Sequence, residues 1–121
     1  MEQFMEQKII FDKKRLLDNF SGDKEGVLDV LKIFIERTEN QLKNFPGLIL
    51  REEWGNARRD AHTIAGSGRT LSAEELGGIA ERLERSCKNK DNTEAAIVLP
   101  LLEESFTRFR EKAADCLEEL K

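Results

Sequence analysis

The sequence of 121 residues lacks any long apolar run. Its longest apolar segment, residues 95–102, is interrupted by Pro100 and is far shorter than the roughly 20 residues that a helix needs to cross a bilayer. The N-terminal stretch MEQFMEQKIIF mixes acidic and amide side chains with apolar ones, so it does not resemble a signal peptide. We therefore expect a cytoplasmic protein that has no membrane partner.

The sequence also has few cysteines and no excess of positively charged residues. Cys87 and Cys116 each fall where a helical pattern places a small buried residue, so we interpret them as core thiols and not as a disulfide. The net charge is −4, which argues against nucleic acid as a partner because phosphate backbones are bound by clustered lysine and arginine. One histidine and two separated cysteines supply too few ligands for a metal site. We expect no metal and no cofactor in this chain.

The sequence does contain strong helical periodicity. Apolar residues recur at alternating steps of three and four, which is the spacing that lines one face of an α-helix. No stretch alternates with a period of two over a useful length, so no sheet is predicted. A single domain of this length is large enough to bury a real core without disulfides or metals.

The first half of the chain predicts a short helix followed by a long one. The short helix covers residues 11–20, with Asp12 as its N-cap. Asp23 caps the longer helix in the same way. Pro46 and Gly47 are expected to end that helix and turn the chain, because proline lacks the N–H that a helix requires.

The second half predicts three more helices, of which the first contains the histidine and ends at Leu71. Ser72 and Glu75 match the S-x-x-E capping box, which would open the next helix. The last helix runs from about Thr93 to the end of the chain and is expected to bend at Pro100 without breaking.

Four long amphipathic helices joined by short loops predict an all-α fold. The arrangement we expect is an antiparallel up-down-up-down four-helix bundle, with the short accessory N-terminal helix covering one end. Residues 1–10 are expected to form a flexible leader, and residues 11–121 the bundle domain.

The only histidine lies in the segment WGNARRDAHTIAGSGRTL, residues 54–71. Small or apolar residues form one face of this predicted helix: Trp54, Ala57, Ala61, Ile64, Gly68 and Leu71. The opposite face holds the histidine and its neighbours: His62, Gly55, Arg58, Arg59, Gly66 and Arg69. Glycine inside a helix costs about 1 kcal/mol relative to alanine. Gly66, one turn from His62, therefore suggests clearance for an approaching partner.

His62 is a candidate acceptor for a phosphoryl group. A largely neutral imidazole can act as a nucleophile near pH 7, and arginines nearby would stabilise an anion attached to it. Phosphoryl transfer fits because its catalysis is mostly positioning and charge neutralisation. No strand precedes Gly66-Ser67-Gly68, so a phosphate-binding loop is excluded, and nothing in the pattern builds an oxyanion site for hydrolysis.

The run Ala61-His62-Thr63-Ile64-Ala65-Gly66-Ser67 resembles the motif of the histidine phosphotransfer (HPt) domains of bacterial multistep phosphorelays. The resemblance covers nearly the whole chain. Further matching positions are Phe11-Asp12, Leu16-Leu17, Trp54, Leu71, Ala73, Leu76 and Leu83-Glu84. As a set these positions are more specific than the short histidine motif alone.

The resemblance implies a four-helix bundle that acts as a phosphocarrier and not as an enzyme. His62 would accept a phosphoryl group from the aspartate of one response-regulator receiver domain and pass it to another. The implied partners are such receiver domains and a hybrid sensor histidine kinase, with Mg²⁺ held by the receiver. Direct phosphorylation by an ATP-dependent kinase domain, as in chemotaxis kinases, ranks below exchange between receivers. We expect a monomer.

Two positions differ from the usual family pattern. The family usually has a lysine three residues after the histidine, where this chain has Ala65, and a glycine ten residues after it, where this chain has Ser72. The first change removes a cation from beside the reacting atom, and we expect Arg58 and Arg69 to substitute for it. The second change is the milder one, since Ser72 gains a capping role.

These observations define a candidate site and leave alternatives open. His62 would be the acceptor, and the surface that meets the phosphoryl group and the partner would consist of Arg58, Arg59, Ala65, Gly66 and Arg69. The alternative, favoured by Ala65, is a degenerate binding module that docks receivers or a kinase without phosphotransfer. A third hypothesis is that the chain is a purely structural helical bundle.

Overall fold

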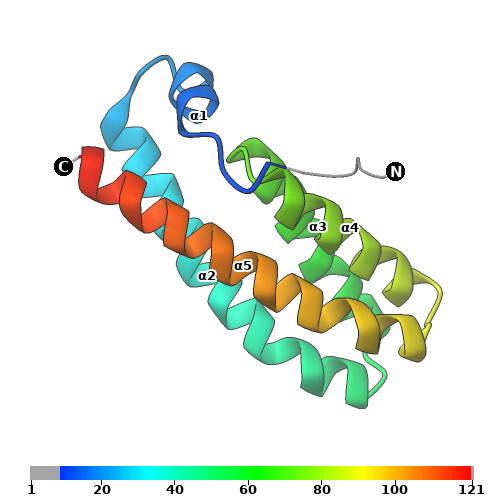
Figure 1. Ribbon diagram of the computed structural model, residues 1–121. Coiled ribbons are helices and arrows are strands. Elements are labelled where there is room, and N and C mark those ends of the chain that lie inside the picture. Colours follow the sequence, from blue (N-terminus) through cyan, green and yellow to red (C-terminus); the bar gives the residue numbers. More distant parts are fainter. Residues whose placement is uncertain (1–8, 121) are drawn as a thin grey trace.

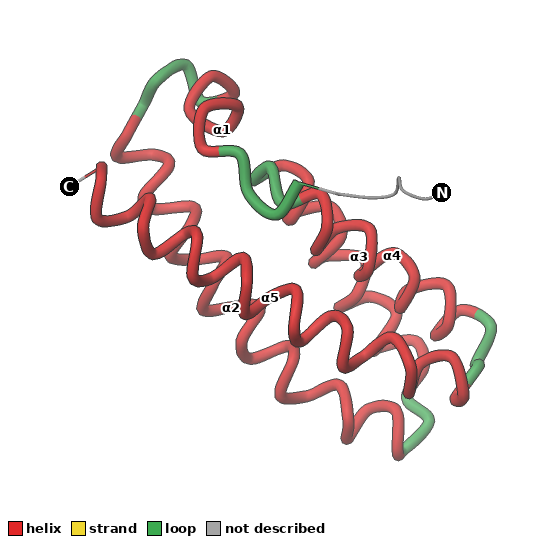
Figure 2. The backbone as a smooth tube through the Cα atoms, viewed as in Figure 1, coloured by secondary structure: helices red, strands yellow, loops and turns green. Residues whose placement is uncertain are grey.

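The computed structural model describes residues 9–120, and this range contains five helices and no strand. The helices are α1 (Lys13–Asn19), α2 (Lys24–Leu50), α3 (Trp54–Thr70), α4 (Glu74–Lys88) and α5 (Asn92–Leu120). Figure 1 shows the four long helices side by side, with α1 at one end, and Figure 2 shows the short loops that join them. The all-α prediction is confirmed. No helix in this range is both long and apolar enough to span a bilayer.

The predicted leader lies outside the described residues except at its last two positions. These two are held by the domain: the Ile9 carbonyl accepts a hydrogen bond from the Glu75 N–H at 2.9 Å, and Ile10 packs against the core. The chain therefore contacts the start of α4 before α1 begins.

The core lies between the long helices. α3 packs against α2 and α4, and α5 packs against the same two helices from the other side. Phe109 of α5 is fully buried and makes edge-to-face ring contacts with Phe34 of α2 at 5.4 Å and with Phe11 at 5.6 Å. Such pairs are a favoured aromatic geometry. They join the segment before α1 to the middle of the bundle.

The predicted N-caps of the first two helices are confirmed. The Asp12 carboxylate accepts a hydrogen bond from the Arg15 N–H at 3.0 Å, and Asp23 accepts one from the Gly26 N–H at 3.0 Å. Each bond satisfies a backbone donor that has no partner within its helix.

The prediction that Pro46 and Gly47 end the second helix is wrong, because α2 continues to Leu50. Pro46 is exposed, so its ring projects from the bundle, and the missing N–H removes a single helical hydrogen bond near the C-terminus. Continuing the helix lets Leu48 and Ile49 pack against the core, which offsets that loss. α5 likewise continues without a break through the exposed Pro100, which confirms the predicted continuity, while the bend expected there stays a prediction.

The predicted capping box at the start of α4 is also wrong. The N-cap is Ala73, and Ser72 is a buried residue with a φ of 65°. Its hydroxyl accepts a hydrogen bond from Arg15 Nε at 3.1 Å, while Glu75 accepts one from the Ser105 hydroxyl at 2.7 Å. Both polar side chains are thus used by tertiary contacts. The left-handed backbone here favours glycine, so serine at position 72 is not a mild change.

α3 and α4 approach closely at a pair of glycines. A Cβ at Gly68 would lie 3.5 Å from the Gly77 nitrogen, which is an ordinary contact. A Cβ at Gly77 would lie 2.8 Å from Arg69 Cγ and 3.2 Å from the Ala65 carbonyl oxygen. A side chain at the second position therefore requires the Arg69 side chain and the nearby backbone of α3 to shift. This contact sets the distance between the two helices.

Replacing Gly77 should destabilise the domain. We expect Gly77→Val to lower the free energy of unfolding by roughly 1–3 kcal/mol, because an overpacked contact forces backbone shifts. Chemical denaturation measures this change. Gly55→Val is the matched control, since a Cβ at Gly55 meets no atom within 4 Å. Equal stability of the two variants would contradict the argument.

Candidate functional site

His62 projects outward from the middle of α3. Its side chain is 73% exposed, whereas Ala61 and Ile64, on the inward face of the same helix, are fully buried. The predicted outward orientation is therefore confirmed. The ring is reachable by a partner without any rearrangement of the bundle.

Glu84 of α4 holds one nitrogen of this imidazole. The distance from His62 Nδ1 to Glu84 Oε2 is 3.0 Å, and the Glu84 side chain is 21% exposed. An ionised carboxylate can only accept a hydrogen bond, so Nδ1 carries the proton in this contact. In a neutral imidazole the other nitrogen, Nε2, then keeps its lone pair available. The contact therefore fixes both the ring orientation and the tautomer.

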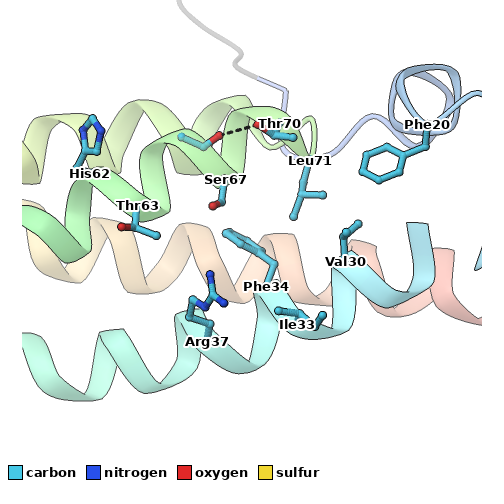
Figure 3. A pocket seen from close by; sticks show the side chains of 11 residues that line it. Phe20, Val30, Ile33, Phe34, Arg37, His62, Thr63, Ser67, Thr70 and Leu71 are labelled. Carbon is cyan, nitrogen blue, oxygen red and sulfur yellow. Dashed lines mark hydrogen bonds between the residues drawn. The ribbon is translucent and has the colours of Figure 1, made fainter. Parts of the chain in front are cut away.

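A groove between α2 and α3 begins beside the histidine and has a volume of about 490 Å³. We call it the α2–α3 groove, and Figure 3 shows the side chains that line it. They are Phe20, Val30, Ile33, Phe34, Arg37, His62, Thr63, Ser67, Thr70 and Leu71, with Gly66 completing the lining. Ile33 is 55% exposed. The groove thus offers mainly apolar surface, and Figure 3 shows His62 and Thr63 at one end of it.

Gly66 leaves the surface near His62 open. A Cβ at this position would meet no atom within 4 Å, so the glycine is not required by packing within residues 9–120. Its carbonyl accepts a hydrogen bond from the Thr70 hydroxyl at 3.0 Å, drawn in Figure 3. Space for an approaching partner therefore remains an explanation for Gly66, since a glycine inside a helix lowers its stability.

The predicted arginines differ in where their side chains go. Arg69 is directed to α4, where Nη1 lies 3.2 Å from Glu81 and Nε lies 3.9 Å from Glu74. The expectation that Arg69 replaces the missing cation beside His62 is therefore wrong. Its side chain starts from the predicted face of α3 but pairs with carboxylates of α4. Arg58 and Arg59 are exposed.

Ala65 is not on the exposed surface around His62, which corrects its place among the site residues. Its side chain is 5% exposed, and its carbonyl faces Gly77 of α4. At about 100° per residue, position 65 is turned roughly 60° away from His62. In this chain that rotation places it inside the contact between α3 and α4.

Sequence reasoning missed two residues near His62, Glu84 and Arg37. The sequence marks Glu84 only as part of a family motif, whereas in the structure it contacts His62 from the neighbouring helix α4, 22 residues away in the chain. Arg37 belongs to α2 and lines the same groove as His62. A periodic pattern identifies the outward face of each helix, but it does not say which outward residues of neighbouring helices meet.

The cysteines take no part in this site. Burial raises the pKa of the Cys87 thiol to about 11, and the nearby Glu84 carboxylate contributes in the same direction. Cys87 is 1% exposed and Cys116 is 2% exposed, and both are free thiols, as predicted. Residues 9–120 contain no group of three or more histidine, cysteine, aspartate or glutamate side chains placed to hold a metal ion.

The geometry is that of an all-helical protein presenting one oriented, solvent-facing histidine. The Hpt domain family matches the chain over residues 29–112, which include His62 and Glu84. This chain therefore belongs to the Hpt domain family, whose members act in histidine phosphotransfer within phosphorelays. Neither the curated proteins nor the solved structures gave a match to this chain.

Removing the Glu84 carboxylate should release the imidazole. We expect Glu84→Ala to reduce the share of the Nδ1–H tautomer and to widen the range of ring orientations, because the only described hydrogen bond to the ring is lost. Nitrogen NMR of isotope-labelled histidine measures the tautomer directly. Glu103→Ala, on the exposed surface of α5, is the control. An unchanged tautomer in Glu84→Ala would show that the contact does not hold the ring.

Proposed function

We propose that the chain is a phosphorelay intermediate in which His62 accepts a phosphoryl group from the phospho-aspartate of one receiver domain and passes it to the aspartate of another. The observation that carries this proposal is the exposed imidazole whose Nδ1 is held by Glu84 while Nε2 faces solvent. Membership of the Hpt domain family supports the same chemistry.

The transfer step needs no additional reactant. The Nε2 lone pair attacks phosphorus, the new N–P bond forms as the bond to the aspartyl oxygen breaks, and the carboxylate leaves with that electron pair. The ring becomes a phospho-imidazolium that retains its Nδ1 proton, and the Glu84 carboxylate stabilises the positive charge. Return transfer reverses these steps. The chain is thus a carrier and not an enzyme with turnover of its own.

The partner we infer is a receiver domain docked over the α2–α3 groove. Exposed apolar side chains such as Ile33 beside a reactive group are typical of a protein interaction surface. Mg²⁺ would be held by the carboxylates of the receiver, since such oxygens are the ligands that this ion prefers. A hybrid sensor histidine kinase would supply the donor receiver.

We also infer that α2 to α5 run alternately up and down, that the domain works as a monomer, and that it functions in the cytoplasm, where receivers and kinase domains exchange phosphoryl groups. The three-residue connections after α2, α3 and α4 support the first of these, because short loops join antiparallel neighbours.

One observation favours a second candidate function. Ala65 is buried and Arg69 is paired with carboxylates of α4, so neither places a cation beside the His62 ring. A module that binds receivers or a kinase without accepting a phosphoryl group would have no need of one. This candidate differs from the first in a single measurable property, the labelling of His62.

Phosphorylation of His62 can be tested with a labelled receiver. Purified protein mixed with a phosphorylated receiver should gain a phosphate that is stable to base and labile to acid, and His62→Gln should abolish it. Phosphate analysis after acid and base treatment measures both properties. Receiver binding that persists in His62→Gln, with no labelling of the native protein by any of several receivers, would instead support the binding module.

Gly66→Ala should separate stability from transfer. We expect the free energy of unfolding to rise by about 0.5–1 kcal/mol, because alanine favours the helix and its Cβ enters open space. Transfer from the receiver should become slower, since the same methyl group occupies the approach to His62. Gly55→Ala, also in open space but two turns away, should leave transfer unchanged. Normal transfer by Gly66→Ala would remove clearance as an explanation.

A further inference from the structure

We propose that Arg37 is an electrostatic docking contact for the receiver, pairing with an acidic group of that partner at the edge of the α2–α3 groove. The inference rests on the proposed function and names a residue on a different helix from the histidine. Arg37 contributes to the association of the two proteins, whereas His62 and Glu84 carry out the transfer of the phosphoryl group.

The position of Arg37 is the first observation. It lines the α2–α3 groove together with His62, and it is the only lysine, arginine, aspartate or glutamate among the described residues of that lining. Figure 3 shows its side chain extending from α2 toward the part of α3 that carries Thr63 and Ser67. A receiver that covers the groove to reach His62 would have to cover or contact this guanidinium.

The second observation is how the arginines of the chain are paired. Seven of the ten arginines form an ion pair with a glutamate: Arg15, Arg51, Arg69, Arg82, Arg85, Arg108 and Arg110. Across residues 9–120, the three without a carboxylate partner are Arg37, Arg58 and Arg59. Arg58 and Arg59 lie within one turn of His62, and Arg37 lies across the groove from α3. Arg59 donates a hydrogen bond to Asn56 at 3.1 Å, and Arg37 is the one of these three arginines that shares the lining of the groove with His62 in the described part of the chain.

This distribution matters because the chain has 24 acidic residues and a net charge of −4. A partner with an acidic face would be repelled by the net negative charge of this chain and attracted to an unpaired arginine such as Arg37. The face of a receiver that carries a phospho-aspartate and the carboxylates around Mg²⁺ is such a face. Charges at the rim of an interface mainly change the association rate and its salt dependence.

The test separates docking from chemistry by using two phosphodonors. Phosphoramidate, a small donor, labels His62 without a docked protein, whereas a phosphorylated receiver must dock first. For Arg37→Gln we expect unchanged labelling by phosphoramidate and a receiver KM raised about fivefold, with a weaker dependence of transfer on salt. Arg37→Lys should restore most of the affinity, and Arg37→Glu should lose roughly tenfold or more.

Lys32→Gln is the matched control, because Lys32 is an exposed cation of α2 that does not line the groove. A receiver KM equal to that of Lys32→Gln would overturn the role of Arg37, and so would a slower reaction of Arg37→Gln with phosphoramidate. Both results leave His62 as the acceptor. Failure of the native protein to be labelled by either donor would instead overturn the proposed function.

Discussion

The close contact between α3 and α4 is the constraint on which the site depends. Gly77 brings the backbone of α4 so near to α3 that a single added carbon would meet the Ala65 carbonyl. Because helices are stiff over one or two turns, this spacing also fixes the distance between His62 and Glu84 further along the same pair. The tautomer of the imidazole is therefore set by packing some distance away from the ring.

The turn that joins these two helices is secured from the N-terminal side of the chain. Arg15 of α1 donates a hydrogen bond to the Ser72 hydroxyl and forms an ion pair with Glu74 at 2.6 Å. The Asp12 N–H also donates to the Ser72 carbonyl at 3.3 Å. The short first helix thus does more than cover one end of the bundle, since it holds a strained turn at the junction of α3 and α4.

The sequence predicted the helices and the outward histidine because both depend on periodicity within one segment. The caps at Asp12 and Asp23 are local in the same sense and were also predicted correctly. The errors arose where a tertiary contact competes with a local preference. Ser72 has the chemistry of an N-cap but bonds to Arg15 instead, and Pro46 is tolerated because the residues beyond it reach the core. Contacts between helices, such as that of Glu84 with His62, could not be predicted, because the periodicity of one segment does not show which residues of another helix it meets.

The arrangement around the imidazole has a consequence for the order of events in the proposed relay. Glu84 contacts Nδ1 of the ring, so Nε2 is the one nitrogen left to accept a phosphoryl group, and the α2–α3 groove lies beside the ring. The donor receiver must therefore dissociate before the recipient receiver binds, and in the proposed relay the phosphorylated carrier is free in solution between these two steps. Several receivers that compete for this carrier would obtain phosphoryl groups in proportion to their concentration and their affinity for it. The carrier could therefore distribute one signal among several receivers.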